Sequence, residues 1–394
     1  AFSDGKFNIT TEFGGWLDEF ISDEELIELI KYADNINLEF GATPIITDPY
    51  TPKIREIERK AMGAGLKLLR AKVRHLGTEE NLKILGRIYN YLKDKIEIRH
   101  ETFLKDLIIE NSQIKGIVVN DDEKIYADNV VLGLGRDGSI FLSELLSKYG
   151  VEMINNRVDI GVRVETSNVV MQEINENLYE GKFVYYTSNG VKVRTFCSNP
   201  SGHVVLENDH HVILANGHSY QDPKLGSENT NFALLVSHKF SEPFNDPNSY
   251  AYSLAKLANK LSCGSVILQR FGDIMLQRRS TEKRIKEGFV VPTLKEAVPG
   301  DLALCLPYKT LSALIEMIKV LDKVTPGIAN DDTLFYGVEA KFYSARVDVD
   351  KTLMVKNINN LYVVGDGAGI TRGLAQASAC GIYVARTISK KEGK

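Results

Sequence analysis

The stretch "NLYVVGDGAGITRGLAQASACGIYVARTI", residues 360–388, indicates the fold class of the chain. The apolar run 361–364 predicts a short buried strand, and Gly365-Asp366-Gly367 ends it. Small residues after Gly373 predict a helix that follows at once. A strand, a glycine-rich turn and a helix in this order are typical of α/β proteins that bind a nucleotide.

Asp366 and the start of the helix have the chemistry that such a ligand needs. A carboxylate at the end of a strand can accept hydrogen bonds from sugar hydroxyls, and flanking glycines allow the ligand to approach the backbone. The first helical turn, at Gly373, Leu374 and Ala375, has little side-chain bulk. Its free N–H groups and positive dipole end therefore suit an electron-rich ligand atom. A tight turn with a capping aspartate is the alternative interpretation.

Composition narrows the class of protein. The chain has 394 residues, enough for two domains, and its 43% hydrophobic and 25% charged residues are typical of globular proteins. A net charge of −4 speaks against nucleic-acid binding, and no apolar run is long enough to span a bilayer. No signal peptide opens the sequence, so we expect a cytoplasmic protein with neither a membrane nor a nucleic-acid partner. The cysteines form no CxxC pair, which predicts no metal site and no disulfide framework (Cys197, Cys263, Cys305 and Cys380).

Periodicity predicts an α/β chain whose two ends form one domain. Helices are expected over 18–34 (capped by Asp18 or Ser22), 53–72, 78–93, 139–149, 246–260 and 309–323. Alternating residues over 95–120 predict strands with a turn near Asn111–Ser112, and residues 129–135 predict a strand buried on both faces. From Val158 the chain becomes mostly β, with a hairpin turn at 188–190. We therefore predict one domain from 1–155 and 336–394, and an inserted domain over 156–335.

The closing stretch resembles the C-terminal flavin motif of the glutathione-reductase-like FAD superfamily. The resemblance implies that Asp366 binds the ribityl or adjoining phosphate region of FAD, and that residues 373–375 face the flavin pyrimidine. The glycines of the same loop are then cofactor-binding residues (Gly365, Gly367 and Gly369). "IYADNVVLGLGRDG" is similar to the superfamily's strand that ends in an alanine-threonine-glycine turn near the cofactor. The resemblance places Gly133 and Gly135 in that turn, although Leu134 replaces the commoner threonine.

Further motifs resemble one family of bacterial and archaeal FAD-dependent dehydrogenases. They are "AFSDGKFNITTEFGGW", "RHLGTEEN", "VDIGVRVE", "RTFCSNPSG" and "LANGHSY", in the family's order along nearly the whole chain. This implies a three-layer, Rossmann-like FAD/NAD(P)-binding domain with an inserted β-rich α+β domain. It also places the opening loop at the flavin, although an ordinary turn is the alternative (Ser3, Asp4, Gly5 and Lys6).

One expected part of such a domain is missing from the sequence. The family begins with a strand, a G-x-G-x-x-G loop and an acidic residue roughly 20 positions further on. None of these is present, so the sequence predicts a chain trimmed of its first βαβ unit. We then expect weakened FAD affinity, and an exposed sheet edge that favours a homo-oligomer.

Four residues are candidates for the chemistry at the flavin. Cys197 could be a redox-active thiol, and His203 or His218 could be a general acid. Arg163 could bind a substrate carboxylate, or it could pair with Glu165 or with another acid at the edge of the core. For the cysteine and the two histidines a packed or surface role is the alternative.

The sequence thus predicts an FAD-dependent oxidoreductase. Hydride would pass through flavin N5 to or from a small molecule that the sequence does not identify, with NAD(P)H as a possible external reductant. Two alternatives remain at this point: a flavin-dependent RNA-modifying enzyme, and a non-catalytic truncated chain that serves as an interaction module.

Overall fold

The computed structural model describes residues 5–220 and 222–393, which form two compact units. Unit 1 takes its described residues from 1–48, 71–156 and 344–394, and unit 2 comprises 49–70 and 157–343. The sequence placed the second boundary at 335/336. The structure places it after 343, because residues 334–341 form a strand inside the sheet of unit 2. The assignment of 49–70 to unit 2 was not predicted.

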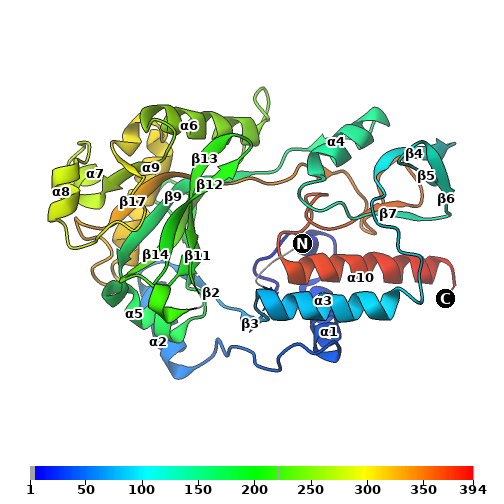
Figure 1. Ribbon diagram of the computed structural model, residues 1–394, viewed down its shortest axis with the longest axis horizontal. Helices are drawn as coiled ribbons and strands as arrows, with labels where there is room; N and C mark the ends of the chain where they lie inside the picture. The colour runs from blue at the N-terminus through cyan, green and yellow to red at the C-terminus, as the bar shows by residue number, and fades with distance from the viewer. Residues whose placement is uncertain (1–4, 221, 394) are drawn as a thin grey trace. The chain divides into compact units, whose positions relative to one another are not determined.

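Unit 1 contains a parallel pair of strands, β7 (Val130–Leu132) and β19 (Leu361–Val363), with Leu361 opposite Val130. The helices α1 (Asp23–Glu39), α4 (Ser139–Lys148) and α10 (Leu374–Lys391) share the hydrophobic core of these strands (Figure 1). Among the described residues no third strand joins the pair. The fold is therefore a mixed α/β fold, and the three-layer dinucleotide-binding arrangement stays a prediction.

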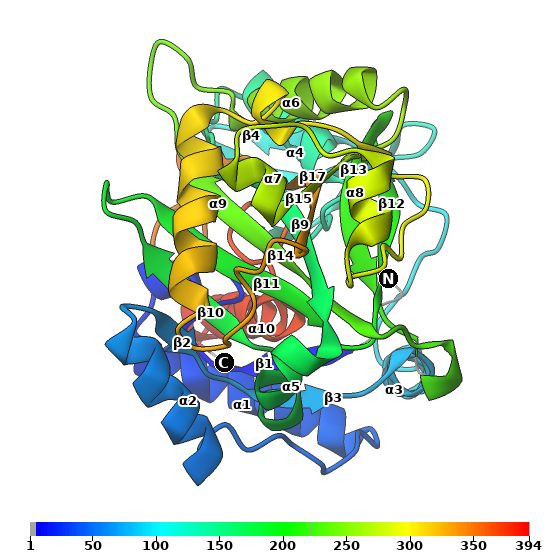
Figure 2. The ribbon, with the colours of Figure 1, turned by 90° about the vertical axis from the view of Figure 1, so that its left-hand side faces the viewer.

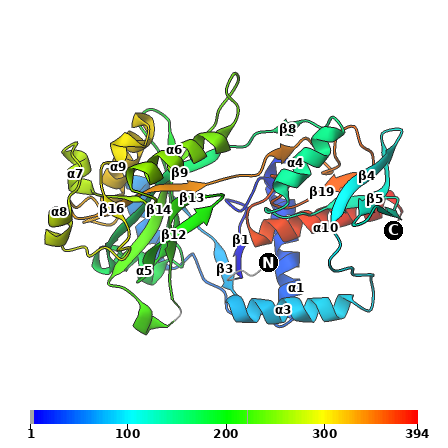
Figure 3. The ribbon, with the colours of Figure 1, turned by 45° about the horizontal axis from the view of Figure 1, so that its top comes forward.

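The other strands of unit 1 are antiparallel. β4 (Leu104–Glu110), β5 (Gln113–Val119) and β6 (Glu123–Tyr126) form a meander (Figure 3), whose first turn is at Asn111–Ser112 as predicted. β1 (Lys6–Ile9) pairs with β3 (Lys72–His75), and β8 (Met153–Ile154) pairs with β18 (Arg346–Val347). α3 (Thr78–Leu92) follows β3.

Local signals explain where α1 begins and which face it buries. Ser22 is the N-cap, and its Oγ accepts a hydrogen bond from the Glu25 N–H at 3.2 Å. Three acidic residues in the first turn favour the helix N-terminus. The helix begins later than predicted because residues 17–19 form a separate 3-10 turn, η1 (Leu17–Glu19). The buried face of α1 packs on α10 (Leu26, Leu29, Ile30 and Ala33).

Two predictions for local structure were wrong. The helix expected over 53–72 is α2 (Pro52–Gly63), followed by β2 (Lys67–Leu69) and β3. Gly65 ends the helix, since its φ of 81° is left-handed and its N–H bonds the Met62 carbonyl at 3.0 Å. The strand expected to be buried on both faces is β7, but Val131 is 44% exposed.

Unit 2 is built on an eight-stranded sheet in the order β16-β15-β17-β9-β14-β11-β10-β2. The strands not yet given are β9 (Val158–Ser167), β10 (Lys182–Tyr186), β11 (Lys192–Asn199), β14 (Asn229–His238), β15 (Ile267–Arg270), β16 (Val298–Pro299) and β17 (Leu334–Lys341). α9 (Tyr308–Leu321) lies across one face (Figure 2), and the hairpin of β12 (His203–Asp209) and β13 (Val212–His218) lies against the other. The remaining helices are α5 (Asn168–Asn177), α6 (Pro247–Leu261), α7 (Phe271–Met275), α8 (Glu282–Glu287), η2 (Pro223–Leu225) and η3 (Leu302–Leu304).

The central strand β9 explains the two faces of this sheet. Val158, Ile160, Val162 and Val164 alternate along it and belong to the core that includes α9. The residues between them point to the opposite face, and three of them are charged and buried (Asp159, Arg163 and Glu165). We call this opposite side the polar face. No helix among the described residues is long and apolar enough to cross a membrane.

Candidate functional site

Two turns of unit 1 meet where its parallel strands end. β19 leads into Gly365-Asp366-Gly367, and β7 leads into residues 133–136. The Val364 N–H donates to the Leu132 carbonyl at 3.0 Å, which keeps the strands paired up to these turns. Because the strands are parallel, both carboxyl ends lie at one edge, where ligands bind in open α/β sheets.

The turns approach each other so closely that glycine is required. A Cβ built on Gly367 would lie 2.2 Å from the carbonyl oxygen of Gly135. Gly365 has a φ of 83°, which is in the left-handed region. The sequence-predicted Gly133 and Gly369 lie in the same turns, the latter next to the backbone of Ala345. The structure thus brings these five predicted glycines together.

Asp366 forms an ion pair that the sequence did not reveal. Arg136 donates from Nε and Nη2 to Asp366 Oδ2 at 3.1 and 2.9 Å. The Arg136 side chain is 62% exposed, so the ion pair contributes little to stability and can be replaced by contacts with a ligand. Asp366 Oδ1 accepts no hydrogen bond from the described residues and is free to accept one from a hydroxyl group.

The N-terminus of α10 lies next to this turn in the chain and has no capping side chain among the described residues. Gly373 is the N-cap, and Leu374 and Ala375 begin the first turn, as predicted. Thr371, just before the helix, is fully buried, and its Oγ1 has no hydrogen-bond partner in the described chain. A helix start with unsatisfied N–H groups and a nearby unpaired hydroxyl can accommodate an electron-rich ligand atom.

A second glycine pair holds this helix start in place and was missed as a site element. The N–H groups of Arg372 and Gly373 donate to the Gly14 carbonyl at 2.8 and 2.9 Å. Gly15 pairs with Thr371, and a Cβ on Gly15 would lie 2.5 Å from Gln376 Oε1. The dipeptide Gly14–Gly15 in "TTEFGGW" was the available signal.

The opening loop is only partly described. Ser3 and Asp4 lie outside the described residues. Gly5 accepts a hydrogen bond from the Leu76 N–H at 3.1 Å, and Lys6 begins β1 opposite His75. β1 packs against α10, so the segment after this loop does lie on the helix that follows the Asp366 turn.

The four catalytic candidates all belong to unit 2. Arg163 has no exposed surface, and its Nη2 donates to Glu339 Oε1 at 2.7 Å. Of the two roles left open by the sequence, the structure therefore shows pairing with an acid, though not with Glu165. Arg163 Nη1 also donates to the Cys197 carbonyl at 2.8 Å. Cys197 itself is half-buried, with a left-handed φ of 49°.

His203 and His218 face each other across the β12–β13 hairpin. Both rings contact Tyr220, at centroid distances of 5.5 and 4.9 Å. His203 Nε2 lies 2.9 Å from the Leu225 carbonyl, which can only accept, so this nitrogen carries the proton. The two histidines form an aromatic cluster, and a general-acid role for either stays a prediction.

A different acid anchors the polar face. Asp159 is buried and accepts hydrogen bonds from Arg194 Nη2 at 2.7 Å, Ser237 Oγ at 2.6 Å and the Tyr343 hydroxyl at 2.5 Å. Burial alone would raise its pKa, but the charge of Arg194 and the hydrogen bonds outweigh burial and lower the pKa to about 2.

We expect Asp159→Asn to change how the free energy of unfolding of unit 2 depends on pH. The ordinary pKa of 3.8 is higher than that in the fold, so the charged form stabilises unit 2 above pH 4. The contribution is about 2 kcal/mol, and it is lost as the pH falls from about 4 to about 2. Urea unfolding at a series of pH values should show that the difference in the free energy of unfolding between wild type and variant disappears over this range. A gap that is the same at pH 6 and pH 2.5 would contradict this role.

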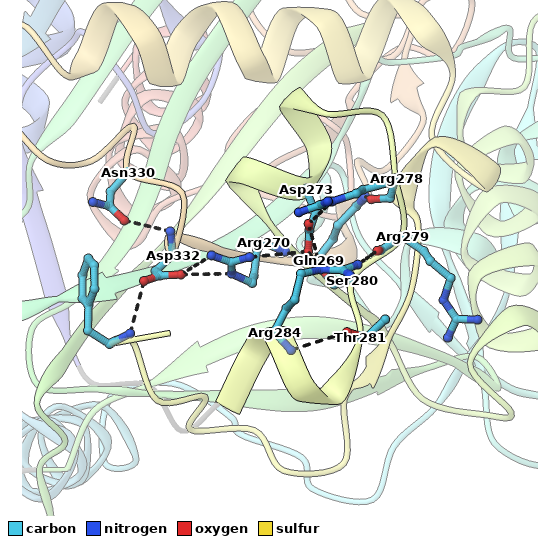
Figure 4. A network of polar contacts seen from close by, with 11 residues as sticks. Gln269, Arg270, Asp273, Arg278, Arg279, Ser280, Thr281, Arg284, Asn330 and Asp332 are labelled. Atoms are coloured by element: carbon cyan, nitrogen blue, oxygen red, sulfur yellow. Dashed lines mark hydrogen bonds and ion pairs between the residues drawn. The ribbon is translucent and has the colours of Figure 1, made fainter. Parts of the chain in front are cut away.

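Another polar network in unit 2 has a structural role (Figure 4). Asp273, at the start of α7, is fully buried and accepts from Arg278 Nε at 2.7 Å and Ser280 Oγ at 2.7 Å. Arg284 also donates to it, at 3.1 Å, while Arg270 pairs with Asp332. Each of these charged side chains has an oppositely charged partner, so the network fixes the segment before α8.

Comparisons with known proteins give one relative that matches along nearly the whole chain. An uncharacterized protein of Clostridium beijerinckii is 29% identical over 413 residues, which span 99% of this chain and 69% of the relative. Among solved structures, the L-proline dehydrogenase of P. horikoshii matches with a TM-score of 0.40 and 12% identity, covering 96% of this chain and 83% of that one. The glycine oxidase of Bacillus cereus matches with a TM-score of 0.35 and 10% identity, covering 98% and 83%. TM-scores this low carry no argument about fold or function.

The more specific similarity concerns unit 2. Residues 157–342 match the family described as "FAD-dependent protein, C-terminal domain-like". These residues nearly coincide with the second segment of unit 2, which runs from 157 to 343. The part of the chain that carries the polar face is therefore similar to the C-terminal domain of FAD-dependent proteins.

Proposed function

We propose that the protein is an FAD-dependent oxidoreductase, with the cofactor bound in unit 1. The observation that carries the proposal is the meeting of the Asp366 turn, the Gly135 turn and the uncapped start of α10. The match of residues 157–342 to an FAD-dependent family supports the same cofactor from the other unit. The substrate is not identified by either observation.

The residues of unit 1 fit the chemical groups of FAD. Asp366 Oδ1 is free to accept a ribityl or ribose hydroxyl, and Arg136 beside it can donate to a phosphate. The N–H groups at the start of α10 and the unpaired Thr371 hydroxyl suit the polar edge of a flavin ring. Bound FAD would supply hydride transfer, and the role of the chain is to bind and orient it.

Three finer assignments belong to this proposal: a three-layer Rossmann-like arrangement of the cofactor domain, a dehydrogenase reaction, and NAD(P)H as an external reductant. They are supported by the sequence resemblance alone. A homo-oligomer, a small-molecule substrate and a cytoplasmic location are also part of the proposal, as expectations from the sequence.

We expect Asp366→Ala to bind FAD at least tenfold more weakly than wild type, because it loses a charge-assisted hydrogen bond to a ligand hydroxyl. Titration of the purified protein with FAD, followed by quenching of flavin fluorescence, measures the dissociation constant. Asp121→Ala is the matched control, since Asp121 is an exposed carboxylate in the turn after β5 and should bind FAD like wild type. Equal affinity of all three proteins would remove Asp366 from the site, and absence of FAD binding by wild type would overturn the proposed function.

A further inference from the structure

The side of the unit 2 sheet that faces away from α9 carries a group of cations. Tyr185, opposite Val193 on the neighbouring strand, donates to Glu316 of α9 at 2.8 Å, so Val193 faces α9. Side chains alternate along a strand, so Lys192 and Arg194 point to the opposite, polar face. Arg194 contacts Asp159 there, in agreement with this assignment.

Arg194 is held rigidly, yet one edge of its guanidinium group is free. Its Nε and Nη2 donate to Asp159 Oδ2 at 3.1 and 2.7 Å, and Nη2 also reaches the Tyr343 hydroxyl at 3.2 Å. The group lies 4.8 Å from the centre of the Phe196 ring. Nη1 donates to no group in the described parts of the chain. A preoriented guanidinium with a free N–H edge suits an oxyanion.

Lys192, two residues before Arg194, has no partner in the part of the chain that the structure describes. It is half-buried and forms neither an ion pair nor a hydrogen bond with residues 5–220 or 222–393. Burial and the charges of Arg157 and Arg194 lower its pKa, and Lys67 acts in the same direction.

Lys192 lies near a like charge. Arg194 points to the same face of the sheet, and Asp159, a carboxylate that acts on Lys192, already accepts hydrogen bonds from three other side chains. A bound anion would relieve the repulsion between the cations and would replace the water that they lose on burial.

We propose that Lys192 Nζ and Arg194 Nη1 form a binding site for an oxyanion, either a carboxylate or a phosphate group of a small molecule. Such a group offers several acceptor atoms, which can bridge an ammonium and a guanidinium group two residues apart on one strand face. On the proposed function, on which this last step rests, the group belongs to the substrate, which is then an organic acid or a phosphate ester. The oxyanion anchors the molecule and takes no part in bond breaking.

Isothermal titration calorimetry with sodium phosphate and with sodium acetate, at an ionic strength held constant with sodium chloride, tests the site. The proteins are wild type, Lys192→Met, Lys192→Gln and Lys256→Met. Methionine keeps the apolar stem of lysine without its charge, and glutamine covers the case that methionine disturbs folding. Lys256 on α6 is an exposed lysine of the same unit and serves as the control. We expect at least one anion to bind wild type and Lys256→Met equally, and both Lys192 variants at least tenfold more weakly. The anion that binds more tightly identifies the group.

Equal binding by the Lys192 variants, or no binding of either anion by wild type, would overturn the site. FAD affinity measured on the same samples separates the two proposals. Anion binding without FAD binding keeps the site and removes the proposed function. FAD binding without anion binding keeps the function and removes the site.

Discussion

Replacing Arg163 by methionine is expected to lower the free energy of unfolding of unit 2 by about 3–5 kcal/mol, because an uncompensated buried charge is left behind. Arg163 and Glu339 are both fully buried, and their ion pair is 2.7 Å long. Without the arginine, the one cation left beside Glu339 among the described residues is Lys341, at 3.3 Å and itself partly exposed. The Cys197 carbonyl and the Asn216 side chain lose donors as well.

Two further variants separate charge from packing. Arg163→Met/Glu339→Met removes both charges and should be clearly more stable than the single variant. Lys341→Met keeps the buried pair. Because the Lys341 side chain is partly exposed, this variant should lose less stability than Arg163→Met. Hydrogen exchange of β9 peptides, read by mass spectrometry, follows unit 2 directly. A loss below 1 kcal/mol for Arg163→Met would show that the pair is dispensable.

Gly367→Ala is expected to disrupt the cofactor turn. The new Cβ would lie 2.2 Å from the Gly135 carbonyl oxygen, a backbone atom that no side-chain rotation can move away. The two turns must therefore separate. We expect a loss of about 1–3 kcal/mol in the stability of unit 1 and a loss of FAD binding. The single tryptophan of the chain, Trp16, lies in unit 1, so its fluorescence during urea unfolding reports this unit alone.

Gly381→Ala is the matched control for this change. Gly381 lies within α10, and a Cβ there would meet no atom within 4 Å. Alanine in a helix interior should stabilise unit 1 by about 0.5–1 kcal/mol and leave FAD binding unchanged. If Gly367→Ala bound FAD as tightly as Gly381→Ala, the contact between the two turns would have no role in the site.

Local signals in the sequence predicted local structure well. Ser22, one of the two caps considered for the first helix, is the N-cap of α1, the turn at Asn111–Ser112 was placed correctly, and Gly365–Gly373 indicated a strand, a turn and a helix. Each of these depends on residues close together in the chain. The assignment of residues 49–70 to unit 2 depends on pairing between β2 and β10, more than a hundred positions apart, which periodicity does not encode.

The candidate site was predictable only in part for the same reason. The sequence identified Asp366 but not Arg136, since the ion pair joins two turns that are distant in the chain. The sequence predicted strands from Val158 onward. It did not indicate that the β12–β13 hairpin covers the polar face of β9, so the burial of Arg163 could not be foreseen. Lys192 was missed because a lone lysine in a strand gives no signal until its neighbours are known.

β2 comes from the segment 49–70, far from the rest of unit 2 in the chain, and this affects how unit 2 can fold during translation or as an isolated fragment. β10 pairs with β2 through Phe183 and Leu68, while Ile54, Ile57 and Leu66 contribute to the same core. A polypeptide cut at the limits of the matched family region, 157–342, would lack all four of these N-terminal side chains and would present β10 as a bare edge. During translation β2 is the strand without a partner, because residues 49–70 are synthesised, with their apolar side chains, long before β10. Supplying 49–70 as a separate peptide would be the direct way to complete such a fragment.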